Sequence, residues 1–141
     1  MRGTLVGLTA GTGKNHIIRA ALESVAYQTA DVISAMDLDM GKPINSLRVD
    51  GGASANDLLM QMQSDISGIE VTRSKNPEAT AAGAAYLAGL AVGFFRDREE
   101  IRSLISGGAS FNPEIDDKTR EKQLVGWRKA VKACRAFSEE E

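Results

Sequence analysis

Aromatic residues are scarce in this sequence, and they are scattered rather than clustered. They make up 5% of the 141 residues, whereas a surface that stacks the bases of single-stranded nucleic acid gathers several aromatics in one place. Acidic and basic residues are mixed along the chain, with a formal charge of -2, so no basic stripe indicates a nucleic-acid partner. No apolar run approaches the roughly 20 residues that span a bilayer, and no cationic amphipathic face indicates a membrane surface. We therefore expect neither partner.

Cysteine and histidine are also almost absent. Cys134 is the only cysteine, which excludes an internal disulfide, so we expect a buried or half-buried thiol and a reducing, cytoplasmic setting. His16 is the only histidine, and it opens a helical pattern without metal-ligand or catalytic-triad spacing. We expect a structural role for His16. The overall balance of 43% hydrophobic and 26% charged residues is typical of a soluble folded domain.

Hydrophobic patterning predicts strands that alternate with helices. We expect strands at residues 4–8, 46–50 and 69–72, and helices at residues 16–39, 56–66, 76–95, 97–105 and 116–138. Helical crossovers between consecutive strands favour parallel pairing. The predicted fold class is therefore α/β: a three-layer α/β/α architecture with mainly parallel strands and extra C-terminal helices. Residues 1–95 are expected to form the α/β core, and residues 96–141 are expected to form peripheral helices.

Two of the predicted helices carry more detailed expectations. Asn15 is a suitable N-cap for the first helix, and Gly41 is a suitable end. The helix that opens at Asn76-Pro77-Glu78 is almost wholly small or apolar, so we expect it to be buried on most faces. The apolar face expected for the first helix recurs at three- and four-residue spacing: Ile18, Leu22, Val25, Thr29, Val32, Ile33 and Met36.

The tract from Asp50 to Asn56 is the most informative candidate site. It joins a strand to a helix through Gly51-Gly52. Ligands of open α/β sheets collect at the carboxyl ends of strands, and helix N-termini offer free N–H groups to phosphate. Glycine lets a ligand approach the backbone closely. The spacing alone leaves two interpretations open: a nucleotide-contacting turn, or a plain tight turn in which Asn56 caps the helix.

A second glycine-rich stretch, Gly11-Thr12-Gly13-Lys14, superficially suggests a phosphate-binding loop. The P-loop pattern requires a glycine five residues before the second glycine and a serine or threonine after the lysine. Leu8 and Asn15 occupy those two positions. We therefore expect no P-loop here.

Several motifs together resemble the FGGY family of carbohydrate kinases. Residues 3–8, followed by seven residues and then residues 16–23, are similar to its C-terminal signature, and residues 47–53 look like its adenosine motif. Residues 77–93 and 126–131 resemble the glycerol kinase branch in particular. The motifs agree in order and spacing along nearly the whole chain.

The resemblance implies a partial ribonuclease H-like domain of the actin-like ATPase superfamily. It implies that ATP lies in a cleft between two domains, and that Gly51, Gly52, Ala53 and Asn56 contact its adenosine and α-phosphate. It implies transfer of a phosphoryl group to an alcohol group of glycerol, with Mg²⁺ on the phosphates. The family's chain is about three times longer. Its catalytic aspartate, glycerol pocket and most of its metal site lie upstream of this sequence, so the resemblance implies no catalytic or metal-ligating residue here.

Two alternatives stay open at this point. The chain could belong to another FGGY kinase, acting on xylulose, gluconate or a related sugar, or it could be a binding or assembly module without catalysis. Without the first strands of its domain, the predicted sheet keeps an exposed edge, which invites pairing with a second copy. We expect self-association, and no kinase activity from this chain alone.

Overall fold

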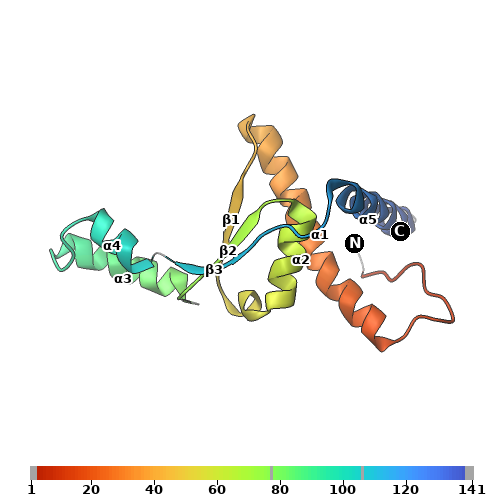
Figure 1. The fold of residues 1–141 in the computed structure, drawn as a ribbon, viewed down its shortest axis with the longest axis horizontal. Helices are drawn as coiled ribbons and strands as arrows, with labels where there is room; N and C mark the ends of the chain where they lie inside the picture. The colour runs from red at the N-terminus through yellow and green to blue at the C-terminus, as the bar shows by residue number, and fades with distance from the viewer. Residues whose placement is uncertain (1–2, 77, 106, 139–141) are drawn as a thin grey trace.

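The computed structural model describes residues 3–76, 78–105 and 107–138 as a mixed α/β structure with a small sheet (Figure 1). Pro77, which belongs to a motif discussed above, lies outside the described residues, as do residues 1–2, 106 and 139–141. In chain order the elements are α1 (Lys14–Met40), β1 (Ser46–Val49), η1 (Gly52–Ala55), α2 (Asp57–Ser67), β2 (Glu70–Ser74), α3 (Ala79–Ala91), α4 (Arg98–Ile105), β3 (Gly108–Phe111) and α5 (Asp117–Ser138). The predicted α/β class is confirmed.

The sheet has the strand order β1-β2-β3. β1 and β2 are parallel, with Arg48 opposite Thr72, as the α2 crossover between them predicts. β3 was not predicted, and it runs antiparallel to β2. A Cβ atom added at Gly108 would collide with the carbonyl oxygen of Arg73, so glycine permits the close approach of β3 to the central strand. In the sequence, Gly107-Gly108 follows the predicted helix at residues 97–105 and resembles a helix end, so β3 was missed.

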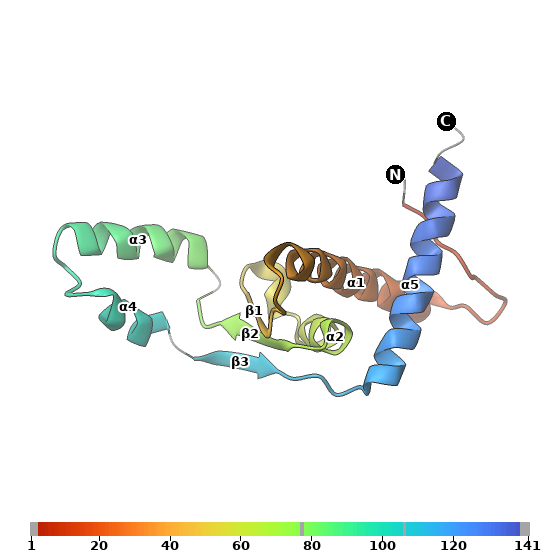
Figure 2. The ribbon, with the colours of Figure 1, turned by 90° about the horizontal axis from the view of Figure 1, so that it is seen from above.

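The buried core forms two small clusters around α2, which lies between α1 and the sheet (Figure 2). One cluster joins α1 to α2 through Ala26, Ala30, Met62 and Ile66. The other joins α2 to the sheet and comprises Leu59, Met60 and Val71, with Leu47, Val49 and Phe111 packed beside them. Ser64 is fully buried, and its hydroxyl lies 2.8 Å from the carbonyl oxygen of Ile69 and 3.0 Å from that of Phe111. α2 therefore anchors both β2 and β3.

Helix α1 is present as predicted, but its packed face only partly overlaps the predicted one, through Leu22 and Ile33. Its N-cap is Gly13 rather than the predicted Asn15, and Gly41 in the left-handed conformation ends it as predicted. The small side chains Ala26 and Ala30 let α2 approach closely and are buried, together with Ile33. The greater part of the predicted apolar face is instead exposed: Ile18, Val25, Val32 and Met36.

The predicted strand at residues 4–8 is wrong. This segment forms neither strand nor helix, and Leu5, Val6 and Leu8 are each more than half exposed. A strand needs a hydrogen-bonding neighbour, and the described sheet contains only β1, β2 and β3. The β-prone composition of residues 4–8 therefore finds no partner within the described part of the chain.

Helices α3 and α4 extend together away from the sheet, as Figure 2 shows. The expectation that α3 is buried on most faces is wrong, because α3 contains no buried residue, and Ile101 is the only buried residue of α4. The rest of the described structure does not surround α3, although its residues are mostly small or apolar. Across residues 3–76, 78–105 and 107–138, no helix combines the length and the apolar character needed to cross a bilayer.

Candidate functional site

The turn that follows β1 adopts a conformation that requires glycine at its first position. Gly51 has φ 81° and ψ 174°, a region that is essentially restricted to glycine. The chain then forms the short helix η1, in which both the backbone N–H and the hydroxyl of Ser54 donate to the carbonyl oxygen of Gly51, at 3.1 and 2.7 Å. The N–H groups of Gly52 and Ala53 open η1 and donate to no acceptor among the described residues. They are exposed donors at the carboxyl end of β1.

Asn56 caps helix α2. Its Oδ1 accepts a hydrogen bond of 3.2 Å from the backbone N–H of Leu59. The capping role was one of the two interpretations that the sequence left open, and it uses only the oxygen of the amide. Within the described part of the chain no acceptor is hydrogen-bonded to the side-chain NH₂ group, which is exposed. Capping and ligand contact are therefore compatible at Asn56.

Arg73, near the carboxyl end of β2, is hydrogen-bonded to this turn. Its Nη1 donates to the carbonyl oxygen of Ser54 at 2.9 Å and to Oδ1 of Asp57 at 2.6 Å. The guanidinium carbon also lies 5.5 Å from the centre of the Phe111 ring, within the range of a cation–π contact. One side chain therefore connects the central strand, η1, the first residue of α2 and β3.

A pocket of about 290 Å³ lies beside the turn, between the carboxyl ends of β1 and β2 and the α3–α4 pair. Its α3 wall has small residues and one aromatic at helical spacing, Ala79, Ala82, Gly83 and Tyr86, and Leu104 and Ile105 add apolar surface. Polar groups line the strand side of the pocket: Arg48, Asp50, Thr72, Arg73, Ser74, Lys75 and Asn76. An apolar slot with a polar border suits a flat heteroaromatic ring that carries polar substituents.

The candidate site residues from the sequence differ in whether they line this pocket. Asp50 lines the pocket, which therefore reaches the glycine turn. Gly51, Gly52, Ala53 and Asn56 form the adjoining turn and do not line the pocket itself. Among the described residues, no cluster of three or more histidine, cysteine, aspartate or glutamate side chains could hold a metal ion.

His16 and Cys134, for which structural roles were expected, are placed as predicted. His16 Nδ1 accepts a 3.1 Å hydrogen bond from the backbone N–H of Gly13 at the start of α1. Trp127 stacks on Tyr27 with ring centres 5.3 Å apart, and its Nε1 donates to Asp31 at 2.7 Å. Cys134 is half-buried.

Sequence reasoning missed Arg73, Lys75 and Tyr86 as neighbours of the site. The position of Arg73 near the end of a predicted strand was an available signal, because parallel strands bring their carboxyl ends to one edge of a sheet. Tyr86 could not be found in this way, since its place beside the sheet depends on how α3 leaves β2.

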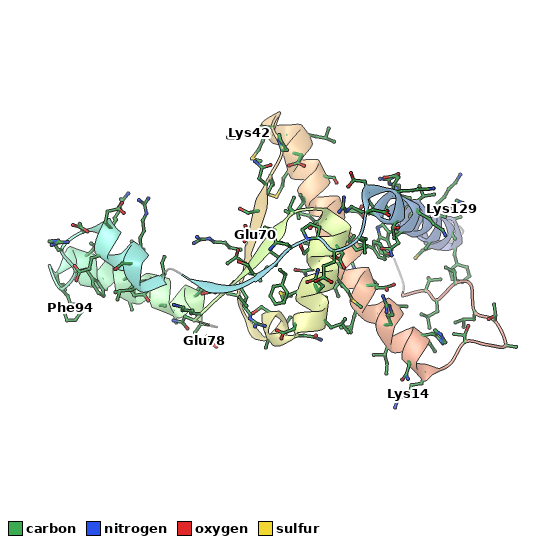
Figure 3. All side chains as sticks on the ribbon, viewed as in Figure 1. Lys14, Lys42, Glu70, Glu78, Phe94 and Lys129 are labelled. Carbon is green, nitrogen blue, oxygen red and sulfur yellow. The ribbon has the colours of Figure 1, made fainter. Side chains whose placement is uncertain are left out.

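Phe94 illustrates how far the helical pair extends beyond the pocket. It lies near the tip of the α3–α4 pair, far from the sheet, while Glu78 lies near the strand end (Figure 3). Phe94 is 78% exposed, although its ring meets that of Phe95 edge to face, with ring centres 5.0 Å apart. The candidate site therefore lies at the strand ends and at the ends of α3 and α4 that are nearest to them.

Comparison with known proteins finds a matching family and similar relatives. Residues 1–92 match the FGGY family of carbohydrate kinases, C-terminal domain. A glycerol kinase of Carboxydothermus hydrogenoformans is 56% identical over 140 residues, which are 99% of this chain and 28% of that protein. The chain thus spans little more than a quarter of the length of this relative.

Solved structures agree with the sequence comparison. The crystal structure of Plasmodium falciparum glycerol kinase with ADP superimposes with a TM-score of 0.85 at 38% identity, covering 92% of this chain and 26% of that one. A ligand-bound xylulose kinase from Lactobacillus acidophilus gives a TM-score of 0.74 at 25% identity, covering 94% of this chain and 28% of that one.

Proposed function

The chain belongs to the FGGY family of carbohydrate kinases, and on that premise we propose that it supplies the nucleotide-binding turn of an ATP-dependent glycerol kinase. The whole enzyme would transfer a phosphoryl group from ATP to an alcohol group of glycerol, giving ADP and glycerol 3-phosphate. The observation that carries the proposal is the Gly51-Gly52 turn, placed at the carboxyl end of a parallel strand and beside a pocket. This is where open α/β sheets bind their ligands.

The contacts proposed for the nucleotide follow from the free groups of the site. The N–H groups of Gly52 and Ala53 would donate to the α-phosphate, because both are exposed and neither has an acceptor in the described structure. The NH₂ group of Asn56 would donate to the nucleoside while its oxygen continues to cap α2. The apolar slot between the strand ends and Tyr86 would take the adenine ring. The P. falciparum relative was crystallised with ADP, which supports this choice of ligand.

We propose that the rest of the enzyme supplies the catalytic groups. Phosphoryl transfer needs metal-assisted charge neutralisation, an oriented nucleophile and a positioned base together. We assign no Mg²⁺ ligand and no base to this chain, because the resemblance to the family implies that these groups lie in the remaining length of the enzyme. Glycerol and Mg²⁺ would be bound mainly by the part of the enzyme that corresponds to the remaining length of the relatives.

A complementation experiment tests the proposal. The chain is co-expressed with the N-terminal portion of the C. hydrogenoformans relative, which ends where this sequence begins to match, and ATP consumption is measured with and without glycerol. Glycerol-dependent turnover that requires both pieces supports the proposal. A purified complex of the two pieces without turnover would contradict it.

A sugar kinase of the same family is the second candidate, and the same assay separates it from the first. The identity of 38% and TM-score of 0.85 to a glycerol kinase structure, against 25% and 0.74 to a xylulose kinase, favour glycerol. Turnover with xylulose or gluconate but not with glycerol would reverse this choice. The N-terminal piece supplies much of the substrate pocket, so the assay is repeated with the corresponding piece of a xylulose kinase.

We also infer that the isolated chain self-associates through its sheet. Neither β1 nor β3 has a described neighbour on its outer side, so each presents unpaired backbone groups. The exposed apolar stripe of α1 adds surface that disfavours a monomer.

A further inference from the structure

We propose that Arg73 is a positioning residue that holds the Gly51–Asn56 turn in its ligand-ready conformation. The proposal rests on the proposed function, since it concerns the same nucleotide-binding turn. It assigns a role to a side chain outside the turn, on a different strand.

The hydrogen bonds of Ser54 connect Arg73 to Gly51. The carbonyl oxygen of Ser54 accepts from Arg73, while its N–H and hydroxyl both donate to the carbonyl oxygen of Gly51. Ser54 is only 5% exposed, so a carbonyl deprived of its donor there would be costly. Loss of Arg73 therefore loosens the short helix whose first two N–H groups face the ligand.

Arg73 lies on β2, the central and most restrained strand of the sheet. β2 is hydrogen-bonded to β1 on one side and to β3 on the other, and Arg73 lies opposite Val49 and Ala109. Its guanidinium also packs over Phe111. Through Arg73, the turn is thus fixed to the central strand of the sheet rather than to an edge strand.

Arginine suits this position better than lysine. The guanidinium presents several donors in a rigid plane, so one end can serve a carbonyl and a carboxylate while its face meets an aromatic ring. The Arg73 side chain is 25% exposed, whereas that of Asp57 is 73% exposed. The exposed ion pair to Asp57 contributes little by itself. We therefore assign the positioning effect mainly to the bond with Ser54.

The test compares Arg73→Met, Arg73→Lys and Asp57→Asn in the full chain. Arg19→Met is the matched control, because Arg19 also pairs with a carboxylate, Glu23 at 2.7 Å, but on α1. Amide hydrogen exchange of Ser54 and Asn56, whose N–H groups are hydrogen-bonded within the turn, is measured without ligand. ADP affinity is measured by NMR titration that follows the Gly52 and Ala53 amides. Thermal melting of each variant separates local loosening from general loss of structure.

Arg73→Met should speed exchange of the hydrogen-bonded Ser54 and Asn56 amides. It should also weaken ADP binding by about tenfold, the scale of one hydrogen bond from a charged donor. Arg73→Lys should recover part of both effects, Asp57→Asn should have a smaller effect, and the control should change neither. The proposal would be overturned if folded Arg73→Met exchanged the amides of the turn at the wild-type rate. It would also be overturned if this variant only melted at a lower temperature. If exchange speeds up but the wild-type chain gives no ADP shifts at Gly52 and Ala53, the positioning role stands and the nucleotide assignment fails.

Discussion

Replacement of Gly51 by alanine should destabilise the chain through its backbone alone. A Cβ atom built at Gly51 meets nothing within 4 Å, so no steric clash contributes. The φ and ψ angles of 81° and 174° lie in a region that costs an L-residue about 1–3 kcal/mol. For a chain of this length, that cost corresponds to a melting temperature about 3–9 °C lower.

The assay is thermal unfolding followed by circular dichroism, with two matched glycine variants. Gly126 lies in α5 with open space around its Cβ position, so Gly126→Ala should stabilise the helix by about 0.5–1 kcal/mol. Gly52 also has open space and no positive φ, so Gly52→Ala should leave stability nearly unchanged. If Gly51→Ala melts with the wild-type chain while Gly126→Ala melts higher, the reasoning about the turn is refuted.

Four further outcomes are expected. Ile66→Ala, in the cluster between α1 and α2, should cost about 2–4 kcal/mol in urea unfolding, whereas Leu58→Ala, at a 53% exposed position, should cost less than about 0.5 kcal/mol; equal losses would contradict the assigned packing. The backbone N–H of Thr119 lowers the pKa of the Asp116 carboxyl, so the resulting stabilisation is present above about pH 4 and is lost as pH falls through the folded-state pKa. Asp116→Asn should reduce the fall in melting temperature between neutral and acidic pH. An unchanged fall would argue against this role of Asp116. Light scattering should give a mass that rises with concentration, and a strict monomer would exclude pairing at the sheet edges. The chain alone should release no ADP in a glycerol-dependent manner, and turnover by the pure chain would refute the assignment of the missing groups to another segment.

Local sequence patterns predicted the elements better than they predicted burial. The helical region of α1 and its end at Gly41 depend on neighbouring residues, and both appear in the structure. Capping by Asn56, one of the two interpretations that the sequence left open, is also present. β3 was missed because its identity depends on pairing with β2 more than 30 residues earlier. The exposed state of Val25 and Val32 was missed because the alanines on another face of the same helix permit closer packing.

The candidate site shows the same division. The position of Gly51-Gly52 between a strand and a helix was readable from the sequence, because turn residues carry their own conformational signal. The connection from Arg73 to Ser54 joins residues 19 positions apart and depends on strand register. Tyr86 reaches the pocket only through the direction in which α3 leaves β2.

The two sides of the pocket differ in how firmly the fold holds them. The turn is tied to the central strand through Arg73, and Ser54 is almost fully buried. The opposite wall comes from α3, which has no buried residue, and from α4, which buries only Ile101. A nucleotide that contacts both sides must fix the helical pair against the sheet, and this ordering costs free energy that reduces affinity. We therefore expect the anchoring of α3 and α4, rather than the geometry of the turn, to limit nucleotide affinity in this chain.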